Sequence, residues 1–375
     1  MSTRMSRGLV ALAVAGVAWG GLATTGAQAA TGSSTQATVS VAPVGTGWTA
    51  AIRHEYAADD GMGSLVVVSP QGQTRTLGAV ADYERVYDVS ADGRHVLTAS
   101  IGIDEVTATV WDTRTGAASP FTYTFDATWQ PMLLAFGGDG LLLSTDAGVQ
   151  TRSITGGAAR SLGLPVKAYT VSPDGSQIFS SKTPGPATVA LSSWDASTGD
   201  LGWSWVIPAA YADNDTACTV SQQWDAGSSA LDCSKIDADG TRASQSFRLG
   251  AGGSVSELTP ADSAWALATT PRRTAWRHSP ESGAACNQFG VLTGVTLSAV
   301  PTMPIERCAA DYTVSGADSR TAWVVQTTYA DIGGQIGESS LKAYDTVTNK
   351  VRVLAGSGSP SGGVITDART VDGHH

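Results

Sequence analysis

Short apolar runs alternate with turn-forming residues along most of the chain, and residues 168–207 show this pattern most clearly. The first apolar run, 168–171, precedes Ser172-Pro173-Asp174-Gly175; the runs 178–179 and 189–191 follow, and the last leads into Trp194-Asp195-Ala196-Ser197-Thr198-Gly199. Proline presets φ early in a turn, aspartate bonds its own backbone, and glycine accepts a positive φ. With a fourth run at 203–207, the segment predicts one antiparallel four-stranded sheet.

The same unit recurs at a nearly constant period. Inner-strand segments resembling 168–172 end at six marker residues, spaced by 46, 36, 49, 47 and 47 positions: Ser90, Phe136, Ser172, Ser221, Ala268 and Ser315. A four-stranded propeller blade occupies about 40–50 residues, so the period predicts blades. Six complete units then account for residues 83 to about 355.

The two ends of the chain supply one further unit between them. Residues 46–80 contain only three strand-like runs, and residues 363–368 form one orphan run after a Gly/Ser/Pro linker. An open ring would leave two unpaired sheet edges, which closure removes. We therefore predict an all-β fold over residues 46–375: a single seven-bladed β-propeller of four-stranded antiparallel blades, closed by pairing of the N- and C-terminal strands.

The turn motifs also carry a family resemblance. The segment 172–181, Ser-Pro-Asp-Gly-x-x-Ile-Phe-x-Ser, resembles the repeat of bacterial secreted TolB-like and WD40-like propellers, and the segment 90–97 is similar. The resemblance covers the mature chain as architecture. It implies a propeller but transfers no functional residue, because the shared motif is a turn.

The amino terminus has the features of an export signal. Arg4 and Arg7 precede an apolar stretch, and Ala27-Gln28-Ala29 is a small-residue cleavage site. We expect residues 1–29 to be a signal peptide cleaved near Ala29-Ala30, residues 30–45 to be a flexible segment, and the mature protein to be secreted. No later stretch has the ~20 apolar residues of a membrane span.

The net charge of the chain argues against some classes of binding partner. The chain has a net charge of −10, and without Arg4 and Arg7 its 21 basic residues face 33 acidic ones, a net charge near −12. An acidic surface argues against nucleic acid and anionic membranes as partners. We expect a monomer.

Four cysteines in an exported chain predict two disulfides, with three possible connectivities. Cys218 and Cys233 lie about equally far from the turn near Asp225-Ala226, so an antiparallel hairpin would place them opposite each other. Cys286 and Cys308 fall in loops expected on one face, where they could join neighbouring blades. A metal or redox site is the weaker interpretation, because the chain has no Cys-x-x-Cys.

Recognisable catalytic motifs are missing from the sequence. It contains no Gly-x-Ser-x-Gly, no P-loop and no His-Glu-x-x-His. The acidic segments Asp59-Asp60, Asp213-Asn214-Asp215 and Asp237-Ala238-Asp239-Gly240 could hold Ca²⁺ only weakly, because the other ligands of a calcium loop are missing. We predict no cofactor and no metal site.

Geometry supplies the candidate binding residues. In a propeller, the loops that enter each inner strand and those that join the second and third strands gather on one face around the channel mouth, here called the entry face. Binding sites favour such loops. The candidates on this face are Tyr83, Glu84, Arg85, Trp129, Gln130, Lys167, Asp213, Asp215, Asp262, Arg307 and Asp311. Tyr169 and Trp265 are expected to pack between blades instead.

Three functions remain open from sequence. The first is a secreted non-catalytic binding or scaffold module that recognises a protein or a cell-envelope glycan through the entry face. The second is a hydrolase or lyase acting on a polysaccharide or lactone, with carboxylates from distant blades converging in the channel. The third is a structural envelope protein. Because no catalytic constellation is recognisable, the sequence favours the binding module over an enzyme.

Overall fold

The computed structural model describes most of the chain from residue 43 onward. The described residues are 43–55, 62–81, 83–124, 133–137, 140–164, 170–172, 175–180, 189–206, 217–220, 228–236, 242–250, 252–258, 264–269, 273–278, 288–293, 296–299, 310–329 and 336–371. They all belong to the second of two compact units, Ala42–His375. Over these ranges the chain is all-β, and none of it forms a helix that could span a membrane. The predicted signal peptide and almost all of the segment 30–45 lie outside them.

The described residues form seven antiparallel four-stranded sheets. Six are each built from four consecutive strands: β4 (Arg85–Val89), β5 (His95–Ile101), β6 (Glu105–Asp112) and β7 (Ala118–Thr124); β8 (Leu134–Gly137), β9 (Gly140–Thr145), β10 (Gly148–Ser153) and β11 (Arg160–Ser161); β12 (Thr170–Val171), β13 (Gln177–Ser180), β14 (Val189–Asp195) and β15 (Leu201–Val206); β16 (Ala217–Val220), β17 (Ser228–Ile236), β18 (Arg242–Gly250) and β19 (Val255–Leu258); β20 (Ala264–Thr269), β21 (Arg273–His278), β22 (Gln288–Thr293) and β23 (Thr296–Ala299); β24 (Ala310–Ala317), β25 (Thr321–Tyr329), β26 (Ile336–Asp345) and β27 (Lys350–Gly356).

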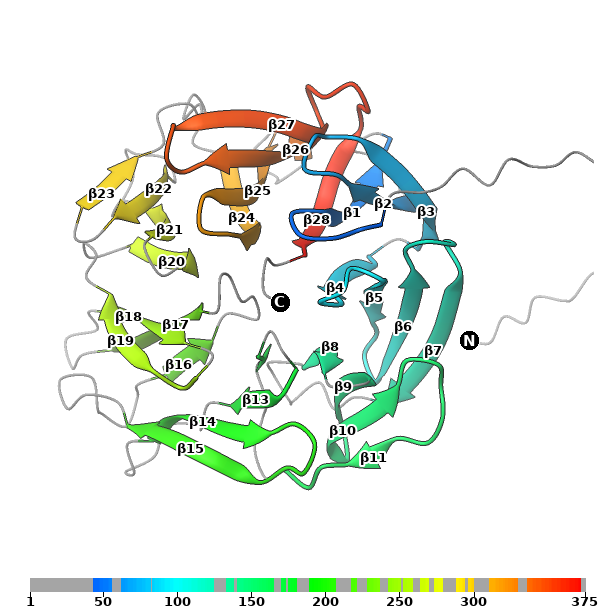
Figure 1. Cartoon of the computed structure of the whole chain (residues 1–375), viewed down its shortest axis with the longest axis vertical. Helices are drawn as coiled ribbons and strands as arrows, with labels where there is room; N and C mark the ends of the chain where they lie inside the picture. The colour runs from blue at the N-terminus through cyan, green and yellow to red at the C-terminus, as the bar shows by residue number, and fades with distance from the viewer. Residues whose placement is uncertain are drawn as a thin grey trace, which may run out of the picture. The chain divides into compact units, whose positions relative to one another are not determined.

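The remaining sheet is composite. It combines β28 (Val364–Thr370) with β1 (Thr49–His54), β2 (Gly63–Val68) and β3 (Thr74–Val80), in the order β28-β1-β2-β3. Counted by continuous segments of chain, the fold has six blades, from β4 to β27, and not the seven that we predicted; the remaining four-stranded sheet is made from both ends of the chain. Each sheet contacts the next in chain order, and the β24–β27 sheet contacts β28, so the sheets form a closed propeller (Figure 1).

The predicted turn aspartates have structural roles. The Oδ1 atom of Asp195 accepts the Ser197 hydroxyl at 2.6 Å and the backbone N–H groups of Thr198 and Ser197, each at 2.8 Å, and these bonds hold the pKa of this carboxyl down to about 2. Asp112 and Asp345 cap the equivalent turns in the same way. Left-handed φ values of 73° at Gly116, 81° at Gly199 and 56° at Asn349 follow from the need to reverse the chain tightly. Asparagine can replace glycine at this position because it tolerates the left-handed conformation.

The predicted pairing of the two chain ends is confirmed. Strand β1 pairs antiparallel with β28 along its length, from Thr49 opposite Thr370 to His54 opposite Val364. The Thr370 Oγ1 atom lies 2.8 Å from Thr49 Oγ1 and 3.0 Å from Ser315 Oγ, within a buried hydroxyl cluster that also ties in β24. Hydrogen bonds between three strands at this joint satisfy hydroxyls that burial would otherwise penalise.

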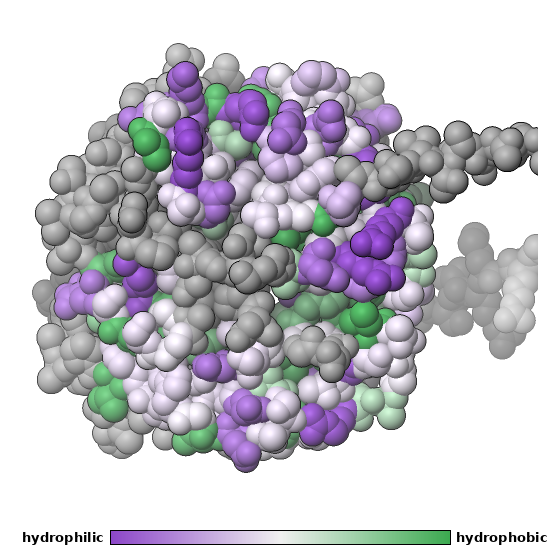
Figure 2. All heavy atoms as spheres, viewed as in Figure 1, coloured by the Kyte–Doolittle hydropathy of each residue, from purple (hydrophilic) through white to green (hydrophobic). Residues whose placement is uncertain are grey.

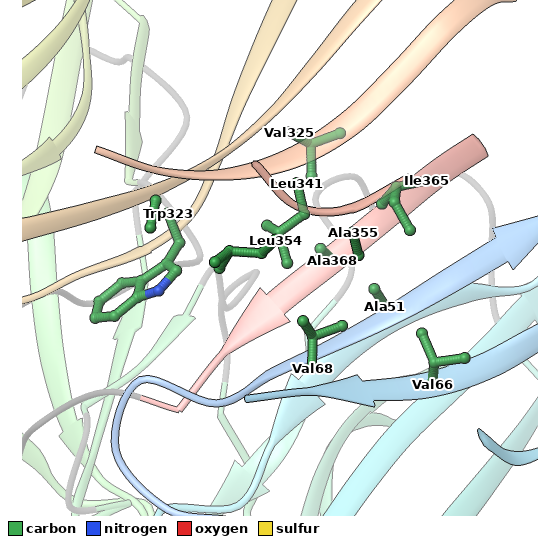
Figure 3. Packing of buried hydrophobic residues seen from close by; sticks show 11 residues of the cluster. Ala51, Val66, Val68, Trp323, Val325, Leu341, Leu354, Ala355, Ile365 and Ala368 are labelled. Atoms are coloured by element: carbon green, nitrogen blue, oxygen red, sulfur yellow. The ribbon is translucent and has the colours of Figure 1, made fainter. Parts of the chain in front are cut away.

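An apolar cluster completes the joint. Ile365 and Ala368 of β28 pack with residues of β1 and β2 on one side and of β25, β26 and β27 on the other (Figure 3). The side chains of Ile365 and Ala368 are 0% and 1% exposed. Strand β28 therefore packs against core residues of its own sheet and of the β24–β27 sheet.

One of the two predicted disulfides lies in the described residues. Cys218 of β16 is directly opposite Cys233 of β17, and their sulfur atoms are 2.11 Å apart. The prediction from strand register is therefore confirmed for this pair. Cys286 and Cys308 lie outside the described residues.

Candidate functional site

The strand register fixes which loops share the entry face. Gly63 at the start of β2 pairs with Val80 at the end of β3, and Arg85 at the start of β4 pairs with Ala99 near the end of β5. The loops β1–β2, β3–β4 and β5–β6 therefore meet at one end of two neighbouring sheets. These loops are the described part of the predicted entry face.

Three of the predicted binding residues can be placed here. Tyr83, Glu84 and Arg85 lie in the loop before β4 and at the start of that strand. Asp311 lies in β24, where only its backbone is described. The other predicted residues lie outside the described ranges: Trp129, Gln130, Lys167, Asp213, Asp215, Asp262 and Arg307. The acidic segments proposed for weak Ca²⁺ binding lie outside them too.

Tyr83 is displayed by a tight, hydrogen-bonded turn. Its side chain is 84% exposed and its φ is 62°, a left-handed value that a bulky residue seldom adopts. The turn is closed by Glu84, whose backbone N–H donates to Ala81 O at 3.3 Å and whose Oε2 accepts the Ala81 N–H at 2.9 Å. A strained, exposed aromatic held by its surroundings is a candidate contact residue.

Glu84 connects this turn to the core of its sheet. Thr98 Oγ1 donates to Glu84 Oε1, and the indole N–H of Trp111 donates to Thr98 Oγ1 at 2.9 Å. Trp111 itself is buried. Because both carboxylate oxygens of Glu84 are engaged, this residue positions the turn, in which the side chains of Tyr83 and Arg85 are exposed.

Three further exposed apolar side chains lie at the same end of these two sheets as Tyr83. Met62 in the β1–β2 loop is 75% exposed, Ile101 at the end of β5 is 47% exposed, and Ile103 in the β5–β6 loop is 84% exposed. We call Met62, Tyr83, Ile101 and Ile103 the entry-face apolar group. A hydrogen bond of 2.8 Å from Gly102 N to Glu105 O holds the loop that carries Ile103. Sequence analysis identified only Tyr83 in this group.

Two buried carboxyl groups join neighbouring inner strands. Asp88 Oδ2 accepts the N–H of Phe136 in the next sheet at 2.7 Å, and its Oδ1 accepts the N–H of Val89 at 2.8 Å. Asp367 repeats the arrangement, with Oδ2 2.8 Å from Val86 N and Oδ1 3.0 Å from Ala368 N. The hypothesis of a hydrolase or lyase needs carboxylates that face a substrate, whereas the oxygens of these two bind backbone amides.

A β-bulge precedes each of these aspartates. The register shifts between Val86 and Asp88 in β4, and between Ile365 and Asp367 in β28. The extra residue re-aims the following side chain. We infer that the bulge turns each carboxyl toward the adjacent sheet. Sequence analysis missed both residues, although an aspartate inside an otherwise apolar inner strand was a readable signal.

Burial raises the pKa of the Asp88 carboxyl to about 6, and that of Asp232 to about 6 as well. A carboxyl with a raised folded-state pKa stabilises the fold fully below its unfolded pKa, and this contribution is lost as the pH rises through 6. We expect each group to add about 1 kcal/mol of stability as the pH falls from about 7.5 to about 5. Thermal unfolding across this range measures the effect.

Single substitutions distinguish the contributions of Asp88 and Asp232 to the pH dependence of stability from those of other groups that titrate over the same pH range. Burial lowers the pKa of His95, so this residue acts in the opposite direction over the same range. Asp88→Asn and Asp232→Asn should each flatten the pH dependence of the melting temperature, whatever they do to stability at one pH. An unchanged pH dependence in both variants would contradict the assignment.

The described residues contain no cluster of three or more His, Cys, Asp or Glu side chains placed to hold a metal ion. The described entry face presents an exposed aromatic ring, three apolar side chains and a few charges. The exposed charged residues beside the apolar group are Glu55, Arg85, Asp104 and Glu105.

Comparison with known proteins supports the fold. No protein-family model matches the chain, and no curated protein matches it. Among solved structures, TolB from Acinetobacter baumannii is similar over 87% of this chain and 67% of that one, with 14% identity and a TM-score of 0.48. An oligogalacturonate lyase in complex with manganese is similar over 83% of this chain and 74% of its own, with 12% identity and a TM-score of 0.37.

A prolyl endopeptidase structure is also similar, with 16% identity and a TM-score of 0.52 over 83% of this chain. The match covers 48% of the endopeptidase chain, so this protein spans about half of its length. At such identities the similarity shows the fold alone. The propeller architecture that the resemblance implied is confirmed by the arrangement of the sheets.

Proposed function

We propose that this protein is an exported, non-catalytic binding module that recognises a protein partner through its entry face. The observation that carries the proposal is the entry-face apolar group. Four of the seven large hydrophobic residues that are exposed in the described part of the chain lie at one end of two adjacent sheets. Clustered exposed apolar side chains mark interaction sites, whereas scattered ones are ordinary.

The chemistry of the group favours a protein over a glycan. Aliphatic Met62, Ile101 and Ile103 offer no hydrogen bonds to sugar hydroxyls, but they suit apolar pockets in a protein surface. On the face seen in Figure 2, hydrophobic residues form small separate groups among polar ones. Recognition by a few anchors surrounded by polar contacts is the usual pattern of protein interfaces.

The rigid turn around Tyr83 adds to this argument. An anchor already fixed by Glu84, Thr98 and Trp111 loses little conformational freedom on binding. The conformational strain of the left-handed φ at Tyr83 is already present in the folded protein, so binding does not add it. The backbone that carries Tyr83 is therefore fixed before a partner binds.

Affinity capture with matched variants tests the proposal. The bait is the chain from Ala30 onward, and the variant is Tyr83→Asn/Ile103→Ser, in which asparagine tolerates the left-handed φ. We expect captured partners from secreted and envelope fractions, and affinity for a purified partner roughly 30- to 800-fold weaker in the variant, because each of the two lost anchors costs about 1–2 kcal/mol.

The control is Val347→Ser, which removes another exposed apolar side chain. Val347 is 58% exposed and lies in the turn after β26, at the opposite end of its sheet. A partner that binds the control and the double variant equally well would refute the assignment of the entry face. Failure of any soluble protein to bind, with the bait shown to be folded, would refute the binding module.

A further inference from the structure

The outer strand β15 differs from every other outer strand in the described sheets. Each sheet ends in an edge strand: β3, β7, β11, β15, β19, β23 and β27. Unpaired edges can pair with another chain, and proteins protect them by charge, proline or shortness. The seven outer strands differ in these three properties.

Six of the seven edges are protected. Arg75 lies in β3, Pro120 in β7, and both Lys350 and Arg352 in β27. Strands β11, β19 and β23 have two, four and four residues. Strand β15, Leu201-Gly202-Trp203-Ser204-Trp205-Val206, has six residues without a charge or a proline. It is the one described edge that lacks all three protections.

The side chains of β15 show which groups remain accessible. Trp203 and Trp205 pack against the core, with ring centroids 5.9 Å from Phe179 and 5.0 Å from Phe247 respectively. Leu201 and Val206, at the two ends, are 55% and 53% exposed. The strand is thus fixed by its tryptophans while apolar surface stays exposed at both ends. In Figure 1 it lies at the outer rim.

From these observations we propose that β15 pairs with β15 of a second copy of this protein, joining two sheets into one. The central Trp203-Ser204-Trp205 reads the same in both directions. In an antiparallel pair centred on Ser204, Trp203 of one copy faces Trp205 of the other, and Gly202 faces Val206. A two-fold interface requires such self-complementarity.

The net charge of the chain and the register of β15 both favour a second copy of the protein as the partner of this strand. The chain is acidic, so copies repel each other, and β15 lets them approach without placing charged side chains opposite one another. Ser204 lies directly opposite Ser192 of β14, with their Oγ atoms 3.1 Å apart, and regular register with β14 extends over Trp203, Ser204 and Trp205, because it shifts on either side, with Gly202 unpaired. The middle of the strand is therefore regular enough to accept a neighbour. This site is separate from the entry face and replaces the expectation of a monomer.

Sedimentation velocity over micromolar concentrations tests the proposal. We expect the weight-average mass of the wild type to rise toward that of a dimer, and Ser204→Lys to keep the protein monomeric. The matched control is Ser256→Lys, the same change at an exposed position of the edge strand β19, which should leave association unchanged. Near-ultraviolet circular dichroism verifies that both variants are folded.

Hydrogen exchange locates the contact independently of the variants. The amides of 201–206 should gain protection as wild-type concentration rises. A monomer at every concentration, an association that survives Ser204→Lys, or concentration-dependent protection confined to other strands would each overturn the proposal. Because partner capture uses the entry face, its failure would leave this result unaffected.

Discussion

Ala368→Asp is expected to abolish the native fold or to lower its free energy of unfolding by about 4–5 kcal/mol. Ala368 is 1% exposed and lies in β28, within the cluster shared by the composite sheet and β25, β26 and β27. A carboxylate there would be buried without a partner and would also force apart packed side chains. Because β28 joins the two ends of the chain, the damage should open the ring rather than remain local.

Denaturant unfolding, followed by tryptophan fluorescence and by circular dichroism, measures this effect. The matched control is Ala118→Asp, the same substitution on the exposed face of the edge strand β7. That variant should unfold within about 0.5 kcal/mol of the wild type. If Ala368→Asp were equally harmless, the closing strand could not have the central role assigned to it.

Much of the fold was readable because its signals are local. A turn built on Asp195 and Gly199 needs only neighbouring residues to form, so its chemistry is visible in a short stretch of sequence. The period of these turns gave the sheets, and the requirement to pair β1 gave the partner strand β28. Even the pairing of Cys218 with Cys233 followed from counting residues on either side of a turn.

The candidate site was less readable because exposure is not a local property. Ile103 follows a glycine between two strands, and nothing in its neighbours tells whether another loop covers it. Likewise, Asp88 is held by an amide of Phe136 in the next sheet, 48 positions away in sequence. Contacts between distant segments determine both the exposure of Ile103 and the hydrogen bond of Asp88. Neighbouring residues in the sequence do not show which contacts form.

Removal of the Cys218–Cys233 disulfide is expected to lower stability by about 3 kcal/mol. The bond closes a loop with a sequence separation of 15, and a loop of this length restricts the unfolded chain by about that amount. Both cysteines are buried beside Phe179 and Phe247, so the double variant Cys218→Ala/Cys233→Ala keeps the site apolar. We expect its melting temperature to fall by roughly 5–10 °C.

The double variant must be measured without reductant, because reductant would also act on any bond made by Cys286 and Cys308. Removing both cysteines together prevents the remaining thiol from forming a new pair. The wild type and the variant should then differ in oxidising buffer and converge when both are reduced. Equal melting temperatures in oxidising buffer would show that this bond does not restrain the unfolded chain. Unequal melting temperatures would show that the disulfide contributes to the stability of the β16–β19 sheet. This sheet otherwise borders β14 and β20 through noncovalent contacts.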